Sequence, residues 1–288
     1  MPGTDSTVRR LLEIEPSAFG RAFARRSIAV QHRLADHPLL RLDAIAELAD
    51  RLPPDSVRRE RGKLSLQNRE GYVDVGQGPP SATILDVERN GFRISLRDIQ
   101  QDAQYAALID ECLDQVDELL RHREGGMRRR TGYLFITAPA SNTPMHFDPE
   151  HSFLLQVRGT KHVSVAAFDD DEVRQHQLDL YYDGEECDFA AMEEVAEEFT
   201  LESGVGVYLP SFVPHWVTTE AGISISFSIP FYTEFSERAE SVNRINRRLR
   251  KLHLSPRGPG ASEPVDRVKA TSFELWGKLR EARSKLPA

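Results

Sequence analysis

The sequence has little of what marks a secreted or membrane-bound protein. It contains only two cysteines, Cys112 and Cys187, in 288 residues. One possible pair is not a disulfide framework, and free thiols suit a reducing compartment. No run approaches the ~18 apolar residues of a membrane span, and the first residues lack the basic-then-apolar pattern of a signal peptide. We therefore expect a cytoplasmic protein with no membrane partner.

An excess of positive charge is also missing. The chain has 45 acidic and 37 basic residues, a net charge of −8 and a pI near 5.7. This balance argues against general nucleic-acid binding, because the phosphate backbone would be repelled. The length is enough for one catalytic domain with a full core and additional helices.

The most informative segment is Thr143-Pro-Met-His146-Phe-Asp148, with a second histidine, His215, in Leu-Pro-Ser-Phe-Val-Pro-His-Trp. On a strand, residues i and i+2 point to the same side, so His146 and Asp148 can converge while Phe147 points into packing. His215 must then come from a neighbouring strand. Two imidazoles and one carboxylate are the ligands of a facial triad that holds Fe(II) and leaves other positions open. The alternative is that both histidines are hydrogen-bonded core residues.

The residues around this motif have the pattern of strands. The segment from Ser152 to Val157 is apolar and is followed by a glycine turn and a second alternating strand that begins near Lys161. A cation there, 15 residues after His146, can receive an anionic co-substrate, although a lone lysine at a strand end is more often solvated. A turn and a short strand, followed by Pro210 and Pro214, lead to His215.

Taken together, these motifs resemble the JmjC/cupin-like (cupin_8) Fe(II)- and 2-oxoglutarate-dependent oxygenases. The matching pattern is Thr-Pro-x-His-x-Asp, then Gly-Thr-Lys, then Gly-Val-Tyr-Leu-Pro-x(3)-Pro-His-Trp, over roughly residues 131–233. It is also similar to the asparaginyl hydroxylase that acts on hypoxia-inducible factor. The resemblance implies a mainly β fold with flanking helices, a double-stranded β-helix (jelly-roll) barrel.

The resemblance also assigns roles to residues. His146, Asp148 and His215 would bind Fe(II) and form the catalytic centre. Thr143 and Lys161 would hold the distal carboxylate of 2-oxoglutarate, the lysine through a charge-assisted pair. Thr143 has an alternative role, the capping of a turn before Pro144.

Two further residues are candidates for co-substrate binding. Tyr133 lies on the strand that enters the motif, where it either hydrogen-bonds the co-substrate or is a half-buried core residue. Ser226 lies on the strand after His215, where the asparaginyl hydroxylase has an asparagine. We expect His151 and His162 to be structural or exposed, because the triad is complete without them.

The activity implied is that of a 2-oxoglutarate-dependent dioxygenase, with O₂ and 2-oxoglutarate as co-substrates and hydroxylation of a protein or peptide side chain as the outcome. Retention of Asp148 favours hydroxylation over halogenation, whereas demethylation would use the same hydroxylation chemistry. Two alternatives stay open. One is a hydroxylase of a small molecule or biosynthetic peptide, and the other is a non-catalytic cupin-like binding or regulatory protein.

Around the expected catalytic barrel (131–233), the sequence predicts an N-terminal helical and mixed region (1–130) that packs on it and C-terminal helices (234–288). These helices either form a homodimer, which we expect, or pack back on their own barrel. An amphipathic helix should begin at Asp102 and end at Gly125-Gly126. Helices are also expected over 236–253 and 271–286. The acidic segment 169–198, with thirteen acids and one base, is either a solvated loop with a short helix near the barrel rim or a field for a basic substrate.

Overall fold

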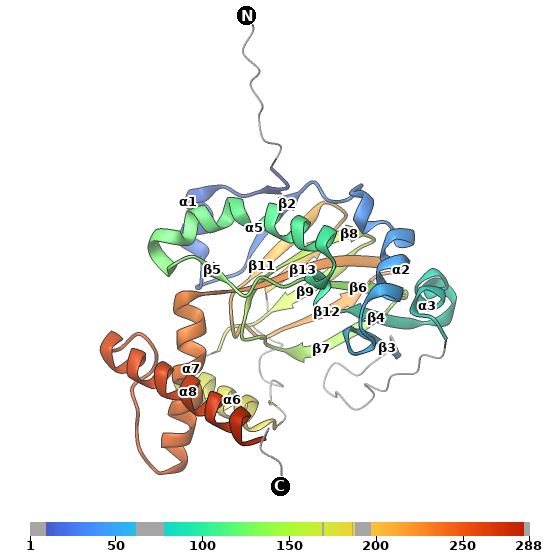
Figure 1. Cartoon of the computed structure of the whole chain (residues 1–288). Coiled ribbons are helices and arrows are strands. Elements are labelled where there is room, and N and C mark those ends of the chain that lie inside the picture. Colours follow the sequence, from blue (N-terminus) through green and yellow to red (C-terminus); the bar gives the residue numbers. More distant parts are fainter. Residues whose placement is uncertain (1–9, 62–77, 169, 186, 188–196, 285–288) are drawn as a thin grey trace, which may run out of the picture. The chain divides into compact units, whose positions relative to one another are not determined.

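The computed structural model describes residues 10–61, 78–168, 170–185, 187 and 197–284. These residues form two compact units (Figure 1). The first unit combines residues 1–167 with 190–231, and the second combines 168–189 with 232–288. The domain boundaries expected from the sequence, after 130 and after 233, stay predictions. No helix in the described ranges is long and apolar enough to cross a membrane.

A nine-stranded sheet forms most of the first unit. All of the pairings described for its strands are antiparallel. Eight strands follow the order β1 (Leu12–Glu13), β2 (Ile28–His32), β11 (Val205–Leu209), β8 (His151–Arg158), β13 (Ser224–Thr233), β6 (Tyr133–Thr137), β4 (Phe92–Leu96) and β3 (Val57–Arg61), and β5 (Met127–Arg128) pairs with β13. The N-terminal region therefore extends both sides of the sheet with strands of its own.

A second antiparallel sheet carries the predicted ligands. Its order is β10 (Glu197–Leu201), β9 (Lys161–Val165), β12 (His215–Thr219) and β7 (Asn142–His146). Apolar side chains from both sheets pack together in one cluster, made of Leu154, Val163, Val165, Leu201, Val207, Leu209 and Val217. Two antiparallel sheets around a shared interior, with flanking helices, confirm the predicted mainly β, jelly-roll type of fold.

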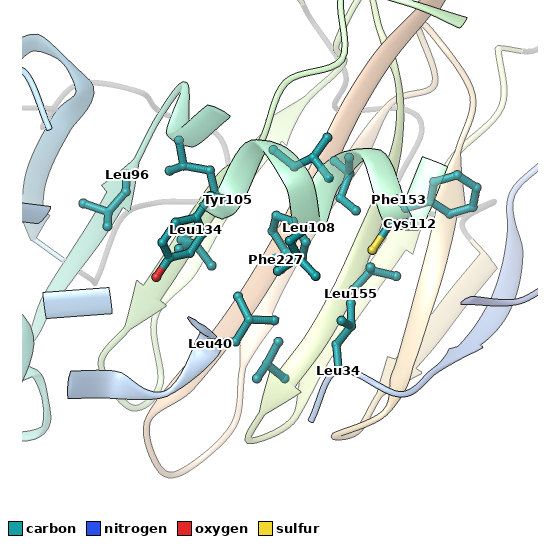
Figure 2. Packing of buried hydrophobic residues seen from close by; sticks show 14 of the residues in the cluster. Leu34, Leu40, Leu96, Tyr105, Leu108, Cys112, Leu134, Phe153, Leu155 and Phe227 are labelled. Atoms are coloured by element: carbon teal, nitrogen blue, oxygen red, sulfur yellow. The ribbon is translucent and has the colours of Figure 1, made fainter. Parts of the chain in front are cut away.

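The other face of the large sheet carries the main apolar core. Helix α5 (Ala103–Glu124) crosses this face (Figure 1), and it begins where predicted, with the Asp102 side chain accepting a hydrogen bond from the Gln104 backbone N–H. Figure 2 shows the helix side chains Tyr105, Leu108 and Cys112 among the buried apolar side chains of the strands. Leu119 of the same helix is 37% exposed.

Shorter helices complete the first unit. These are α1 (Pro16–Ala22), α2 (Leu42–Arg51), α3 (Pro80–Leu85), α4 (Val87–Asn90) and 3-10 turns at Pro38–Leu40, Pro54–Ser56 and Ile99–Gln101. Helix α2 ends before Pro53, since proline cannot continue the backbone hydrogen bonds. It buries Ile45 and Leu48 in the main core.

Strands β8 and β9 do not pair with each other, although they are joined by a short glycine turn that suggests a hairpin. β8 lies in the large sheet and β9 in the small one. Gly159 makes the crossing with φ of +75°, and a Cβ on it would lie 2.5 Å from the Ile223 carbonyl oxygen. Only glycine tolerates both conditions. The turn therefore transfers the chain between sheets and brings Lys161 onto the face opposite β8.

The second unit consists of three helices, α6 (Asp171–Asp183), α7 (Glu234–Lys251) and α8 (Glu263–Ser284). Helix α7 begins with a capping box between Thr233 and Ser236. Helix α8 starts eight residues before the predicted 271, and residues 285–286 of that prediction lie outside the described residues.

Part of the acidic segment pairs in this unit with the basic end of α7, Arg244-Ile-Asn-Arg-Arg-Leu-Arg-Lys251. Arg250 donates to Asp179 at 2.5 Å, and both Arg247 and Lys251 contact Asp183. The basic end of α7 is therefore neutralised by acids of α6, which leaves little free charge there for a nucleic acid. The rest of the acidic segment, including 188–196, lies largely outside the described residues, and its place near the barrel rim stays a prediction.

Candidate metal centre and co-substrate site

The three predicted ligands come together at one end of the small sheet. Strands β7 and β12 pair so that His146 lies opposite His215. One ligand atom from each of His146, Asp148 and His215 lies within 4.8 Å of the others. The Asp148 Oδ2 atom is 3.9 Å from the Nε2 atom of each histidine. Donor atoms on adjacent octahedral positions at ~2.1 Å from a metal are roughly 3 Å apart. A contraction of about 1 Å would thus place all three on one ion.

Both imidazoles are oriented by the backbone. His146 Nδ1 donates to the Pro144 carbonyl at 2.8 Å, and His215 Nδ1 donates to the Val213 carbonyl at 3.0 Å. With the proton held on Nδ1, the lone pair of each ring is on Nε2, the atom that faces Asp148. This is the arrangement that metal-binding histidines use, in which a second hydrogen bond fixes the tautomer. The donor set therefore fits a divalent metal.

Asp148 reaches the site from a loop and not from the strand, which ends at His146. His146 and Asp148 converge as expected, although Asp148 lies two residues beyond the end of the strand. The Asp148 carbonyl accepts from the Phe212 backbone N–H at 2.7 Å, and the Phe147 ring packs on the Phe212 ring at 5.8 Å. Phe147 does point into packing, as predicted. Its contact with the loop before His215 holds Asp148 near both histidines.

Alternate residues of β12 share the inner face of the small sheet, and their strand partners extend from the metal ligands to Lys161. His215 pairs with His146, Val217 with Thr143, and Thr219 with Lys161. Two steps along a strand span roughly 13 Å between backbones, and the lysine side chain reaches over part of that distance. Metal ligands and cation therefore face the same interior at different depths.

Lys161 is a buried cation with no acidic neighbour bonded to it in the described ranges. It is only 5% exposed, and its Nζ lies 5.9 Å from the centre of the Phe135 ring. Burial, together with the nearby charge of Arg93, lowers the pKa of Lys161 to about 7. A carboxylate beside it would reverse this effect, because an opposite charge favours the ammonium form. The position suits the distal carboxylate of a dicarboxylic co-substrate.

Thr143 lies beside an arginine that the sequence analysis missed. Its Oγ1 accepts from Arg93 Nη1 at 2.8 Å, while Arg93 Nη2 pairs with Glu60 at 2.9 Å. Arg93 comes from β4, fifty residues earlier in the chain. The alternation in Phe92-Arg-Ile-Ser-Leu is the one available sequence signal, and it places Arg93 and Ser95 on the same face of the strand.

Tyr133 and Ser226 lie on adjacent strands, β6 and β13. Tyr133 is half-buried, and burial followed by the carboxylates of Glu150 and Asp98 raises its pKa, so the phenol keeps its proton. The Ser226 hydroxyl donates to Gln156 Oε1 at 2.7 Å. In this structure Ser226 thus belongs to a buried polar network of the protein. A co-substrate role for either residue stays a prediction.

The other two histidines singled out by the sequence have structural partners. His151 is buried, which lowers its pKa to about 3, and its Nδ1 is 2.9 Å from the Tyr208 hydroxyl. It therefore stays neutral within the aromatic core. His162 Nε2 is 2.8 Å from a Glu220 carboxylate oxygen. Neither belongs to the cluster of possible metal ligands found in the described residues.

Residues 105–238 match the family model of the JmjC domain. This segment, just under half of the chain, is similar to JmjC domains. This segment includes all seven predicted site residues, whereas Arg93 and Glu60 precede it. The resemblance to this family is therefore confirmed, while the specific likeness to the asparaginyl hydroxylase is not tested by these matches and stays a prediction.

Individual relatives agree with this assignment. The chain is 32% identical over 102 residues to Jumonji C domain-containing protein 5 of Drosophila melanogaster, a match that covers 32% of this chain and 25% of that protein. The chain thus matches only a quarter of that relative's length. The structure of YcfD from Escherichia coli superimposes with a TM-score of 0.50 at 14% identity, over 92% of this chain and 68% of YcfD. A second YcfD structure, a complex of this ribosomal oxygenase with cobalt and 2-oxoglutarate, also gives a TM-score of 0.50 at 14% identity, over 92% of this chain and 66% of that one. These structural matches show the fold.

Proposed function

We propose that this protein is an Fe(II)- and 2-oxoglutarate-dependent oxygenase that hydroxylates a side chain of a protein or peptide. The proposal is carried by the inner face of the small sheet. One end of this face holds His146 and His215, with Asp148 beside them on a loop, and the other end holds Lys161, which has no bonded carboxylate in the described ranges. Together they match the two ends of a co-substrate that chelates a metal and ends in a carboxylate.

Each residue contributes a defined part of the chemistry. His146, Asp148 and His215 would hold Fe(II), which when bound couples O₂ activation to the decarboxylation of 2-oxoglutarate to succinate and CO₂. Lys161 would bind the distal carboxylate and so orient the co-substrate toward the ligands. The apolar side chains of Val163 and Val217, between these two ends, would exclude water from it.

Two considerations support a polypeptide substrate. The Asp148 side chain is 51% exposed while that of His215 is 7% exposed, so the ligand set is open to solvent on the Asp148 side. An open site admits a side chain carried on a large molecule. YcfD is described as a ribosomal oxygenase, and by analogy of fold we favour a protein substrate here. We place the activity in the cytoplasm, since the structure describes no disulfide at Cys112 or Cys187, as suits a reducing compartment.

Succinate release is the direct test. The Fe(II)-loaded protein should convert 2-oxoglutarate to succinate under O₂, and peptides from the native host should gain 16 Da in proportion. His146→Ala should lose both reactions, because two ligands do not retain the metal. The matched control is His162→Ala, which alters a partly buried histidine outside the metal cluster and should leave both reactions intact. A wild-type protein that binds the metal but never releases succinate would favour a non-catalytic binding module. A +16 Da product found only among metabolites would favour the small-molecule hydroxylase.

We also propose that the second unit forms a homodimer. Nine large apolar side chains are exposed in the described part of the chain, and seven of them lie within this unit: Phe235, Leu252, Leu254, Val265, Val268, Leu275 and Trp276. Apolar surface on this scale usually has a partner. A second copy is the simplest partner, because most oligomers of soluble proteins pair identical surfaces.

A further inference from the structure

A row of polar side chains crosses the inner face of the large sheet, in front of the co-substrate site. Strand register places Glu60 opposite Arg93, Arg93 opposite Thr137, and Thr137 opposite Ser224. Directly opposite residues share a face. Ile94 pairs with Ile136 on the other face, in the main core. Arg93 therefore points into the interior that the small sheet also faces.

Arg93 joins the two sheets across that interior. Its side chain is 8% exposed and its Glu60 partner 3%, so the ion pair is shielded from water. Its other terminal nitrogen donates to Thr143 Oγ1 on β7, in the opposite sheet. The Arg93 guanidinium is fixed in position because its two terminal nitrogens, Nη1 and Nη2, donate to separate acceptors on Thr143 and Glu60.

The bond from Arg93 determines what the Thr143 hydroxyl can do. An arginine donates and never accepts, so Thr143 uses a lone pair toward Arg93 and keeps its own O–H for a different acceptor. The described residues supply no acceptor for it. Thr137 Oγ1, also buried, has no hydrogen-bond partner among them either. Three hydrogen-bond donors near Arg93 therefore lack an acceptor in the described residues: the hydroxyls of Thr143 and Thr137 and the ammonium of Lys161.

Such a gathering points to an acceptor-rich ligand, since buried polar groups are normally satisfied. The charges agree. Glu60 balances Arg93, which leaves the positive charge available at Lys161 to be balanced by an anion. The ligand chemistry that fits is a carboxylate, which accepts several hydrogen bonds and carries one negative charge.

We infer that Arg93 is a positioning residue for the carboxylate of the co-substrate, acting through Thr143 by directing its O–H toward the space beside Lys161. This inference rests on the proposed function, and Arg93 and Glu60 lie outside the segment that matches the JmjC family. The Glu60 carboxylate in turn holds Arg93 at the right depth. Thr143 thus acts as a fixed donor and not as a turn cap.

The test compares binding equilibria in the full chain, without turnover. The proteins are wild type, Thr143→Val, the paired variant Arg93→Met/Glu60→Met, and all three substitutions together. The paired variant removes both buried charges, which is better tolerated than leaving one unpaired. Ser95→Ala is the matched control, because Ser95 is a buried residue two positions along β4. Calorimetry measures the Kd of Co(II), and then the Kd of 2-oxoglutarate for the Co(II)-loaded protein.

We expect Thr143→Val and the paired variant each to raise the 2-oxoglutarate Kd about tenfold. The Co(II) Kd and visible spectrum should stay unchanged, which a general loss of structure would not allow. The triple variant should be no weaker than either parent, since Arg93 acts through Thr143. Ser95→Ala should bind normally.

Separate results would overturn separate claims. A wild-type protein that takes up Co(II) but not 2-oxoglutarate would refute the proposed function. If wild type binds both, a folded paired variant with a 2-oxoglutarate Kd within twofold of wild type would refute the role of Arg93 alone. Multiplicative losses in the triple variant would also refute it, because they would mean independent routes. Should the paired variant fail to fold, an unchanged Kd in Thr143→Val would be sufficient to refute the inference.

Discussion

Two buried cations at the site differ in how they are balanced. Arg93 has Glu60 as its partner at 2.9 Å, whereas Lys161 has no bonded carboxylate in the described ranges. A buried charge without a counter-ion is costly, so Lys161 destabilises the unliganded protein to the extent that it is charged. A bound anion supplies the missing counter-ion and removes this cost, which is why Lys161 should bind an anion.

Removing the Lys161 charge should therefore weaken the binding of 2-oxoglutarate. We expect Lys161→Met to raise its Kd on the Co(II)-loaded protein by about ten- to a hundredfold, which corresponds to roughly 1.5–3 kcal/mol for a charge-assisted bond. Metal affinity should not change. Lys251→Met, which removes an exposed lysine paired with Asp183, is the control and should bind normally. Calorimetry decides, and equal Kd values for the two variants would mean that the anchor lies elsewhere.

The lowered pKa of Lys161 also predicts a pH dependence. In the unliganded protein the amine loses its proton as the pH rises through about 7. A bound carboxylate favours the ammonium form, so the pKa of Lys161 is higher in the complex. Between these two pKa values binding takes up a proton, and the affinity falls up to about tenfold per pH unit. Below pH 7 Lys161 is charged in both the unliganded protein and the complex, so binding takes up no proton there and the affinity no longer depends on pH through this residue.

Calorimetry in buffers of different ionisation enthalpy measures this uptake. Near pH 8 we expect 2-oxoglutarate binding to take up a substantial fraction of one proton in wild type and to lose that fraction in Lys161→Met. Zero uptake in wild type at that pH would contradict the prediction.

At the scale of single residues, the site residues that could be predicted are those that belong to short sequence motifs. The His-x-Asp motif, the distant histidine and the lysine were all identified, and the structure brings the three ligands together. Arg93 was missed because its role depends on pairing between β4 and β6 and on a contact to β7, which no spacing along the chain encodes. The loop contact from Asp148 to Phe212 could not be foreseen, because the two residues are far apart in the sequence.

At the scale of elements, β11 depends on the absence of a side chain at Gly206. A Cβ there would lie 2.8 Å from the Leu154 carbonyl oxygen and 2.6 Å from a Leu155 methyl. Backbone cannot yield as a flexible side chain does, so we expect Gly206→Ala to destabilise the fold by about 1–3 kcal/mol. Urea unfolding followed by circular dichroism measures the change.

Gly20 is the matched control for this substitution. It lies in α1 of the same unit, and nothing lies within 4 Å of a Cβ added to it. Gly20→Ala should leave stability unchanged or raise it by up to about 1 kcal/mol through helix propensity. If both variants unfold at the same urea concentration, close packing between β11 and β8 does not restrict Gly206.

The elements also show where sequence reasoning stops. Helix α5 could be predicted because its cap and its apolar periodicity are local. The pairing of strands is not local, so a glycine turn that suggested a β8–β9 hairpin in fact carries the chain between sheets. Leu252, the C-cap residue of α7, is 70% exposed, while the polar side chains of Asn243 and Asn246 in the helix are buried. Asn246 is accounted for by its bonds to Arg257 and Lys269.

At the scale of the whole molecule, charge within the second unit is satisfied internally while its apolar surface is not. Acids of α6 pair with bases of α7, and Arg248 lies over the Trp276 ring of α8 at 3.9 Å. These contacts hold the three helices together. They leave Val268, Leu275 and their neighbours exposed, which is the pattern of a surface that is covered by association and not by its own unit.

The homodimer is therefore tested at α8. Light scattering coupled to gel filtration should give twice the mass of 32.6 kDa for the full chain at micromolar concentration. Leu275→Glu buries a charge in the expected interface and should shift the protein to monomer, because an unpaired buried charge costs several kcal/mol. Leu85→Glu is the matched control, since Leu85 is 59% exposed and Leu275 56%, but Leu85 lies on α3 in the first unit. It should stay dimeric. A monomeric wild type would refute the dimer, and loss of the dimer in Leu85→Glu alone would move the interface to the first unit.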